Sequence, residues 1–426
     1  MSAQRGFRSM PFVRFCLFSL LLASNVSLAE EWWMSPSLRL EGEYNDNISL
    51  TTQPHSSVRS TLVAPRLDLG VQAPVWQVSG SAEFLRQSYS DRSNLGRDRQ
   101  YYRFSSKYLT ERSTWRLDGN RSYAPVLVGD TVDPDVGLAP IRKERKSTDI
   151  YPSWTWMMTE LTQLQLAYQK NDATYENGEL FGLFDYSSRG VTAGMSHQLS
   201  FRTKASLNFA YSIFDVPANR FESRSSSVMA GLSHSFSDTL SASFSVGAQR
   251  TVSDGFIRGD CLTRELVGFF DSDFNLTFVE VCTAYDIVSV SQDRTTNLIN
   301  ASLEKKFEAT RLSASFGRSI TPSGTGVLSQ TDTLSIQVSR AFSSRLTGKF
   351  LVGAYDVSSG FEQFTDTDRR LYYVNPAMVW QWTPRWGLET ALRYNRLKYD
   401  NSSDTATSRA VFLKLLYSGP KMSISR

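Results

Sequence analysis

The chain has 426 residues, of which 41% are hydrophobic and 21% are charged, and its 46 Lys and Arg nearly balance its 42 Asp and Glu. This balance excludes the strongly basic surface field that attracts nucleic acid. The mean hydropathy is negative, and beyond the N-terminal segment no apolar run approaches the roughly 20 residues that a membrane-spanning helix requires. A helical membrane protein is therefore excluded as well.

Residues 1–29 have the features of a secretory signal peptide. Arginines precede an apolar run from Phe15 to Ala23, and Ser27-Leu28-Ala29 then forms a small-x-small cleavage site. The run is too short to remain as a membrane anchor. Cys16 within it has no lipobox-like sequence around it, so lipidation is not expected. We therefore expect an exported chain that begins at Glu30.

Alternation of apolar and polar residues with a period of two dominates the rest of the chain. It is clear from Trp76 to Leu85, and residues 203–214, 239–251, 331–342 and 385–396 repeat it. Such alternation indicates β-strands with two different faces. Most of these segments have about ten residues or more, which is the length that a tilted strand needs to cross the hydrocarbon of a membrane.

Eighteen segments of this kind follow one another. They lie at residues 34–45, 60–72, 75–89, 100–110, 114–123, 148–158, 162–172, 186–198, 203–214, 225–236, 239–251, 294–306, 310–320, 331–342, 346–356, 369–382, 385–396 and 407–417. Their connectors alternate between short ones, such as Ala73-Pro74 and Thr383-Pro384, and long ones, such as Ala124–Ser147 and Val252–Asp293. Short periplasmic turns and long extracellular loops are typical of outer-membrane barrels.

We therefore predict an all-β protein, a transmembrane up-and-down antiparallel β-barrel of about 18 strands, with about 16 as the alternative count. The barrel is expected to occupy residues 30–417 and to lie in the bacterial outer membrane. A short periplasmic C-terminal tail is expected at residues 418–426. Because the strand number is even, both ends of the barrel are expected on the periplasmic side.

Aromatic residues are distributed as the two membrane interfaces would require. Seven of the nine Trp lie near a short connector, whereas tyrosines such as Tyr44, Tyr211, Tyr372 and Tyr394 lie nearer the long ones. Two belts of this kind are expected where rings meet the membrane surfaces. The alternative is a soluble β-sandwich or propeller with an aromatic core. Faces so rich in Ser, Gln and Asn would give such a fold a poor interior.

If the apolar phase faces lipid, the other phase lines the lumen. The cationic candidates for that lining are Arg39, Arg66, Arg103, Lys107, Arg116, Arg311, Lys349 and Arg393. They are interspersed with carboxylates, so the lumen has a mixed charge with a small cationic excess. The segments 203–214, 225–236, 239–251 and 331–342 are nearly uncharged on this phase and carry mostly Ser, Asn and Gln. Hydroxyls and amides both donate and accept hydrogen bonds, which suits a neutral or weakly anionic solute such as a sugar. A merely wettable barrel interior is the alternative.

The longest insertion, Ser253–Asp293, contains both cysteines that follow the signal peptide, Cys261 and Cys282. In an oxidising compartment the two are expected to form a disulfide, with a stabilisation of about 3 kcal/mol for a loop of this size. The insertion is also rich in apolar residues. We expect a loop that either folds inward as a constriction or covers the mouth as a lid.

Catalytic chemistry is not expected. The chain has three His, and the pairs Ser196-His197 and His234-Ser235 resemble the Ser-His arrangement of outer-membrane lipases only superficially. Neighbouring residues of a strand point to opposite faces, so neither pair can form a dyad. We find no metal-ligand spacing and no phosphate-binding loop, and therefore expect no cofactor.

Both ends of the predicted barrel resemble one family. The first strand opens at Pro36 and ends in Tyr44-Asn45-Asp46-Asn47-Ile48, a Tyr-x-Asp-Asn-aliphatic motif, and the C-terminal segment Tyr417–Arg426 is also similar. These segments resemble the β-barrel proteins of exopolysaccharide-biosynthesis operons (EpsL-like). The resemblance implies a role in passing or anchoring secreted polysaccharide, with periplasmic export components as partners. It brings no catalytic residues.

Outer-membrane lipid and the insertion machinery are expected partners of any such barrel. Many outer-membrane proteins end on an aromatic residue that this machinery recognises, whereas this chain ends at Arg426, and Tyr417 closes the last apolar phase. Three functional hypotheses result. The leading one is an outer-membrane channel for passive export of an extracellular polysaccharide. The others are a nutrient porin for small solutes and a non-conducting scaffold.

Overall fold

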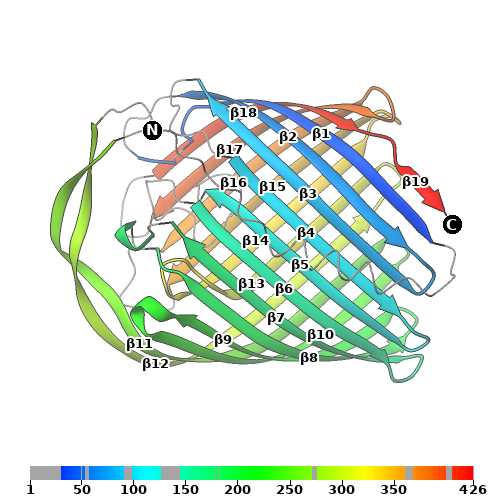
Figure 1. The fold of residues 1–426 in the computed structure, drawn as a ribbon. Helices are drawn as coiled ribbons and strands as arrows, with labels where there is room; N and C mark the ends of the chain where they lie inside the picture. Colours follow the sequence, from blue (N-terminus) through cyan, green and yellow to red (C-terminus); the bar gives the residue numbers. More distant parts are fainter. Residues whose placement is uncertain are drawn as a thin grey trace.

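The computed structural model describes residues 30–48, 50–52, 57–90, 98–125, 144–176, 178–181, 183–270, 276–359, 368–399 and 405–425. Within these ranges nineteen strands form one sheet, and eighteen of them close into an antiparallel barrel because β1 pairs with both β2 and β18. Every other barrel strand pairs with its neighbours in the chain, so the topology is up-and-down. The closed wall and its tilted strands are visible in Figure 1.

The barrel strands have the following bounds: β1 (Glu31–Asn45), β2 (Val58–Gln72), β3 (Trp76–Tyr89), β4 (Asp98–Leu109), β5 (Ser113–Pro125), β6 (Glu144–Met157), β7 (Thr162–Tyr175), β8 (Tyr186–Ser200), β9 (Thr203–Val216), β10 (Phe221–Ser237), β11 (Leu240–Phe270), β12 (Leu276–Lys306), β13 (Thr310–Pro322), β14 (Leu328–Ala341), β15 (Leu346–Ser359), β16 (Arg369–Gln381), β17 (Trp386–Tyr399) and β18 (Thr405–Ser418). The predicted fold class and the count of eighteen are confirmed, and sixteen is wrong.

Two short 3-10 helices, η2 (Gly178–Phe181) and η3 (Pro217–Asn219), lie in connectors at the long-loop end. In the part of the chain that the structure describes, no helix has the length and apolarity needed to cross a membrane.

The alternation predicted from sequence determines which side chains face outward. Large apolar side chains on one phase remain exposed, for example Phe209 (52%), Val246 (47%) and Leu392 (53%). Near the short turns this phase carries packed tryptophans, including Trp115, Trp154 and Trp156 on β5 and β6. An apolar outer surface on a closed antiparallel barrel is what hydrocarbon requires. The protein is a barrel of the bacterial outer membrane.

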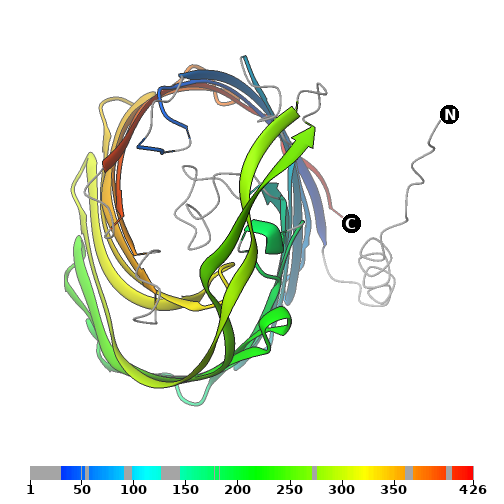
Figure 2. The same cartoon turned by 90° about the vertical axis from the view of Figure 1, so that its left-hand side faces the viewer.

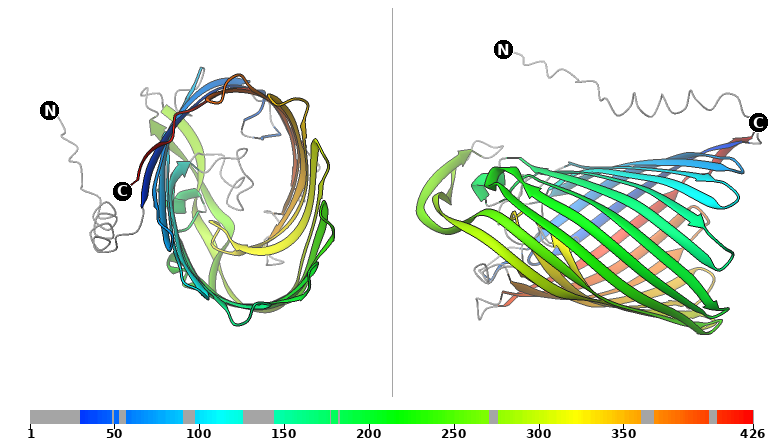
Figure 3. Two further views of the ribbon diagram at one scale, coloured as in Figure 1. Left: turned by 90° about the vertical axis from the view of Figure 1, so that its right-hand side faces the viewer. Right: turned by 90° about the horizontal axis from the view of Figure 1, so that it is seen from below.

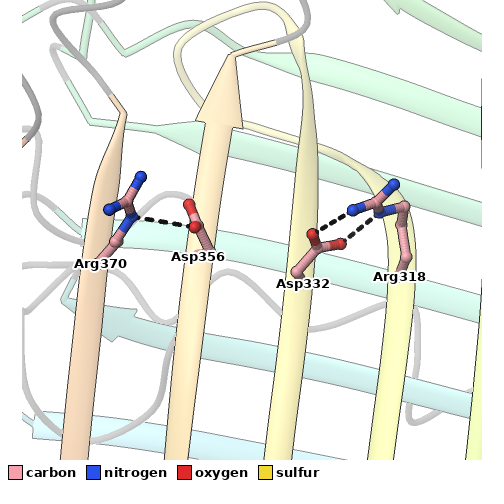
Figure 4. A network of polar contacts seen from close by, with 4 residues as sticks. All are labelled: Arg318, Asp332, Asp356 and Arg370. Carbon is pink, nitrogen blue, oxygen red and sulfur yellow. Dashed lines mark hydrogen bonds and ion pairs between the residues drawn. The ribbon is translucent and has the colours of Figure 1, made fainter.

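A row of charges bounds the apolar surface toward the long-loop end. Arg318, Asp332, Asp356 and Arg370 occupy paired positions on β13–β16, on the same phase as outward-facing Leu334. Arg318 donates to Asp332 at 2.7 and 2.6 Å, and Arg370 donates to Asp356 at 3.1 Å (Figure 4). Because cations are costly at the membrane midplane, this row lies at or beyond the outer boundary of the hydrocarbon.

The predicted loop Ser253–Asp293 is mostly strand. β11 and β12 each extend to 31 residues, and their ladder continues to Phe270 opposite Leu276. The expectation of a loop is therefore wrong. Register irregularities between Arg258 and Arg264 interrupt the pairing, so a period of two is not kept through this stretch of the hairpin. The resulting hairpin projects beyond the barrel wall (Figure 1) and crosses in front of its opening (Figure 2).

Gly255 lies where this hairpin leaves the wall. Its φ of +145° is unusual for other residues, and a Cβ atom there would lie 2.5 Å from the Arg220 carbonyl oxygen and from the Phe221 Cα. Only glycine allows β11 to pass this close to the start of β10.

The side chains of Cys261 and Cys282 lie outside the described parts of the structure. The backbone ladder places Cys261 opposite Tyr285 and Cys282 opposite Arg264. The disulfide between them stays a prediction.

The predicted C-terminal tail contains a further strand, β19 (Met422–Ser425), which pairs with Glu31–Met34 at the start of β1. Lys421 forms an ion pair with Glu31 at 2.6 Å. Both described ends of the chain therefore lie at the short-turn end of the barrel, as Figure 3 shows.

The Tyr-x-Asp-Asn-aliphatic motif joins the first strand to the last. Asn47 is 1% exposed, and its side-chain amide donates to the carbonyl oxygens of Thr51 and Thr407, both at 2.9 Å. Asn45 accepts from the Ser408 hydroxyl at 3.0 Å and from the Asn47 backbone at 2.9 Å. The motif thus holds the strand pair β1 and β18, the seam at which the barrel closes.

Candidate functional site: the barrel lumen

The inward phase of the strands forms two chemically different walls. On β1–β6 it carries many charged side chains, whereas on β8–β14 it carries mostly hydroxyls and amides. We refer to them as the charged wall and the hydroxyl wall. The contrast predicted from sequence is therefore present, and each kind of side chain covers a continuous stretch of the wall.

The cations of the charged wall mostly lie beside carboxylates. Arg39 approaches Glu83 at 3.6 Å, and Arg66 and Arg116 contact Asp68 and Asp118, both at 2.6 Å. Arg103 lies with Arg66, Asp68 and Asp118 around a hollow of about 480 Å³ that is also lined by Trp33 and Tyr151. Partly solvated pairs of this kind contribute little to stability, but they reduce the net field in the lumen.

The remaining predicted lining cations also lie on the inward phase. Lys107 belongs to the charged wall on β4. Arg311 approaches Glu304 at 3.5 Å near a periplasmic turn, and the Arg393 guanidinium lies 4.7 Å from the centre of the Phe412 ring. Lys349 is on β15, opposite Ser339 and Ala377. The structure distributes the eight candidates around the lumen and does not bring them together in one site.

The hydroxyl wall is ordered into rows by strand register. Five serines occupy mutually paired positions on five consecutive strands, β10 to β14: Ser233, Ser243, Ser302, Ser315 and Ser335. The hydroxyls of Ser243 and Ser302 lie 2.7 Å apart. Toward the periplasmic end this wall contains a polar hollow of about 320 Å³, lined among others by Gln163, Lys204 and Asn208.

Two connectors meet across the extracellular mouth. The Phe184 backbone N–H, between β7 and β8, donates to the Gly324 carbonyl oxygen, between β13 and β14, at 2.7 Å. These strands are separated by β9–β12 in the wall, so the contact spans the opening above them. The buried side chains around it form what we call the roof cluster: Ala173, Tyr175, Leu183, Phe184, Tyr186, Phe214, Val216, Phe221, Val327 and Leu328.

The roof cluster also supports the hairpin, because Val288 of β12 packs against it. The sequence pattern predicts only the long insertion as a constriction and does not indicate a role for these two shorter connectors. The sequence does contain one sign of this cluster, because Phe214, Val216 and Phe221 are apolar residues on the inward phase, which is otherwise polar. Their burial between loops distant in sequence was not visible in any local pattern.

The two barrel histidines lie on the outward phase near periplasmic turns, as expected. The Nδ1 of His197 is 2.8 Å from the Thr162 hydroxyl, and that of His234 is 2.9 Å from the Thr203 hydroxyl. Each ring thus has a threonine partner on the neighbouring strand. Among the described residues no group of three or more His, Cys, Asp or Glu side chains is placed to hold a metal ion.

No known family model and no curated protein matches the chain. Solved outer-membrane structures do resemble it. Pseudomonas aeruginosa OpdK with vanillate aligns over 92% of this chain and 99% of its own, with 10% identity and a TM-score of 0.44. Acinetobacter baumannii OccAB4 covers 93% and 99%, with 9% identity and a TM-score of 0.47. A bacterial polysaccharide outer membrane secretin covers 90% and 97%, with 9% identity and a TM-score of 0.35. Identities this low concern the barrel architecture alone.

Proposed function

We propose that the protein is a passive outer-membrane channel for small, uncharged polar solutes. The observation that carries this proposal is the hydroxyl wall, which faces a charged wall whose cations mostly have carboxylate neighbours. At this strand number a barrel encloses enough space for water. A neutral solute can exchange its hydration for contacts with Ser, Asn and Gln without crossing a strong charge barrier.

The roof cluster favours a narrow, selective opening rather than a wide one, because it covers part of the mouth above β9–β12. No catalytic step belongs to this proposal. The direction of transport then follows the concentration gradient of the solute.

Conduction is tested by inserting the purified full-length barrel into planar lipid bilayers. We expect discrete conductance steps with weak ion selectivity. In vesicle-swelling assays, neutral mono- and disaccharides should enter faster than charged solutes of equal mass. A barrel that inserts fully but gives no conductance and no swelling would leave only the scaffold hypothesis.

Export of an extracellular polysaccharide is the second candidate. It is supported by the EpsL-like terminal segments and by the extent of the hydroxyl rows, which cross five strands. Deletion of the gene separates the two. Loss of surface polysaccharide with normal growth on small nutrients would favour export, whereas slower growth on limiting small nutrients with normal polysaccharide would favour uptake.

A further inference from the structure

Two tyrosines stack on the inward phase of the wall beside the hydroxyl wall. The rings of Tyr355 on β15 and Tyr373 on β16 have centroids 5.6 Å apart and an interplanar angle of 28°. Gly353 makes room for them, because a Cβ atom at this position would overlap the Tyr373 hydroxyl and ring. The pair is half-buried, so it presents aromatic surface to the lumen.

Strand register connects the serine row to this pair. The row that includes Ser302, Ser315 and Ser335 continues to Gly353, and Gly353 is paired with Tyr373. This first row therefore ends on Tyr373.

A second row lies two residues further along each strand and ends on the other tyrosine. It runs across seven consecutive strands from β9 to β15 through Ser206, Gly231, Ser245, Asn300, Gly317, Thr333 and Tyr355. Its glycines make room for neighbouring polar side chains, because a Cβ atom at Gly231 would lie 2.7 Å from the Ser206 hydroxyl and one at Gly317 would lie 2.8 Å from the Asn300 amide oxygen. Its other members before Tyr355 carry a hydroxyl or an amide. The two rows together are called the hydroxyl track.

The track climbs along the lumen, because barrel strands are tilted to the axis. Ser233 lies near the periplasmic turn after Ser237, whereas Tyr373 lies near the extracellular end of β16, which begins at Arg369. No member of the first row from Ser233 to Tyr373 is charged, and no member of the second row from Ser206 to Tyr355 is charged. A ligand following this path meets hydroxyls and amides first and an aromatic pair near the extracellular end.

We propose that the hydroxyl track and the Tyr355–Tyr373 pair form a binding track for neutral linear oligosaccharides. Sugar hydroxyls exchange hydrogen bonds with Ser, Thr and Asn side chains, each of which both donates and accepts. The C–H face of a sugar ring packs on an aromatic face, whose negative quadrupole attracts the weakly positive hydrogens. This inference rests on the proposed channel function and names its class of solute.

The test uses the full-length barrel in planar bilayers with maltohexaose and cellohexaose as probes. We expect transient current blockades by both neutral hexasaccharides and weaker blockade by a hexamer of galacturonate. Substitution of Tyr355→Ala or Tyr373→Ala should shorten the residence time on the order of fivefold, as expected for the loss of one aromatic contact. Tyr373→Phe should keep most of the residence time.

Tyr151→Ala is the matched control, since Tyr151 is a luminal tyrosine on the charged wall. If the channel conducts but the hexasaccharides leave the current unaffected, the track is refuted while the channel stands. Equal residence times in the two tyrosine variants and the control would also refute it. Titration calorimetry on the detergent-solubilised barrel, with the same probes and variants, tests the track even if the barrel does not conduct.

Discussion

Asn45, the last residue of β1, and Asn47, which lies two residues beyond it, show how single side chains help to close the barrel. Asn47 bonds to backbone groups on both sides of the seam, to Thr51 next to β1 and to Thr407 on β18. The sequence showed this motif only as a family resemblance. Its role in joining β1 to β18 depends on contacts between residues more than three hundred positions apart, which no local pattern reveals.

Asn47→Ala should destabilise the barrel by about 2–3 kcal/mol, because the Asn47 side chain is buried and its hydrogen bonds to the carbonyl oxygens of Thr51 and Thr407 would be lost. Urea unfolding of the barrel in lipid vesicles, followed by tryptophan fluorescence, measures the change. Asn208→Ala is the control, since Asn208 is an exposed luminal amide, and it should stay within about 0.5 kcal/mol of the unchanged protein. Equal unfolding midpoints for the two variants would show that the seam does not depend on Asn47.

Individual elements were predictable to the extent that their signal is local. All eighteen barrel strands could be located from alternation alone, because the side chains within each strand follow the same period of two. The extension of β11 and β12 into a long hairpin was not predicted, because the register shifts between Arg258 and Arg264 interrupt the regular pairing there. The roof cluster was not predicted, because Phe184 and Gly324 come into contact only in the closed barrel. The hydroxyl track required strand register, which the positions of serines within single strands do not determine.

The roof cluster predicts that the two connectors that meet at Phe184 and Gly324 restrict the mouth of the channel. Phe184→Ala removes a ring that is 3% exposed, and should cost about 3–5 kcal/mol of packing within the roof. Because the strand ladder is untouched, the barrel itself should remain folded. We expect a higher or more fluctuating single-channel conductance, recorded in planar bilayers. Phe236→Ala, on the outward phase beside a periplasmic turn, is the control and should conduct normally. A conductance unchanged in both variants would mean that ions do not pass near the roof.

At the scale of the whole molecule, charges that line the lumen should affect ion selectivity, whereas charges on the outer surface should not. Charge substitutions on the two faces can distinguish these effects. The outward phase carries cations too, among them Arg396 and Lys398 near the extracellular end of β17, and both are exposed. Only cations on the inward phase lie in the field that a permeating ion crosses. The lumen has a modest cationic excess, so the channel should prefer anions weakly, and this preference should decrease as salt screens the wall.

The double substitution Arg103→Gln and Lys107→Gln removes two positive charges from the charged wall. It should move the reversal potential in a salt gradient toward zero, since anions lose part of their advantage. The matched variant, Arg396→Gln with Lys398→Gln, removes the same two residue types from the outer face of β17 and should leave the reversal potential unchanged. If the outer pair shifted selectivity as much as the luminal pair, the assignment of the two faces from strand alternation would be wrong, and the hydroxyl track would lose its place in the lumen.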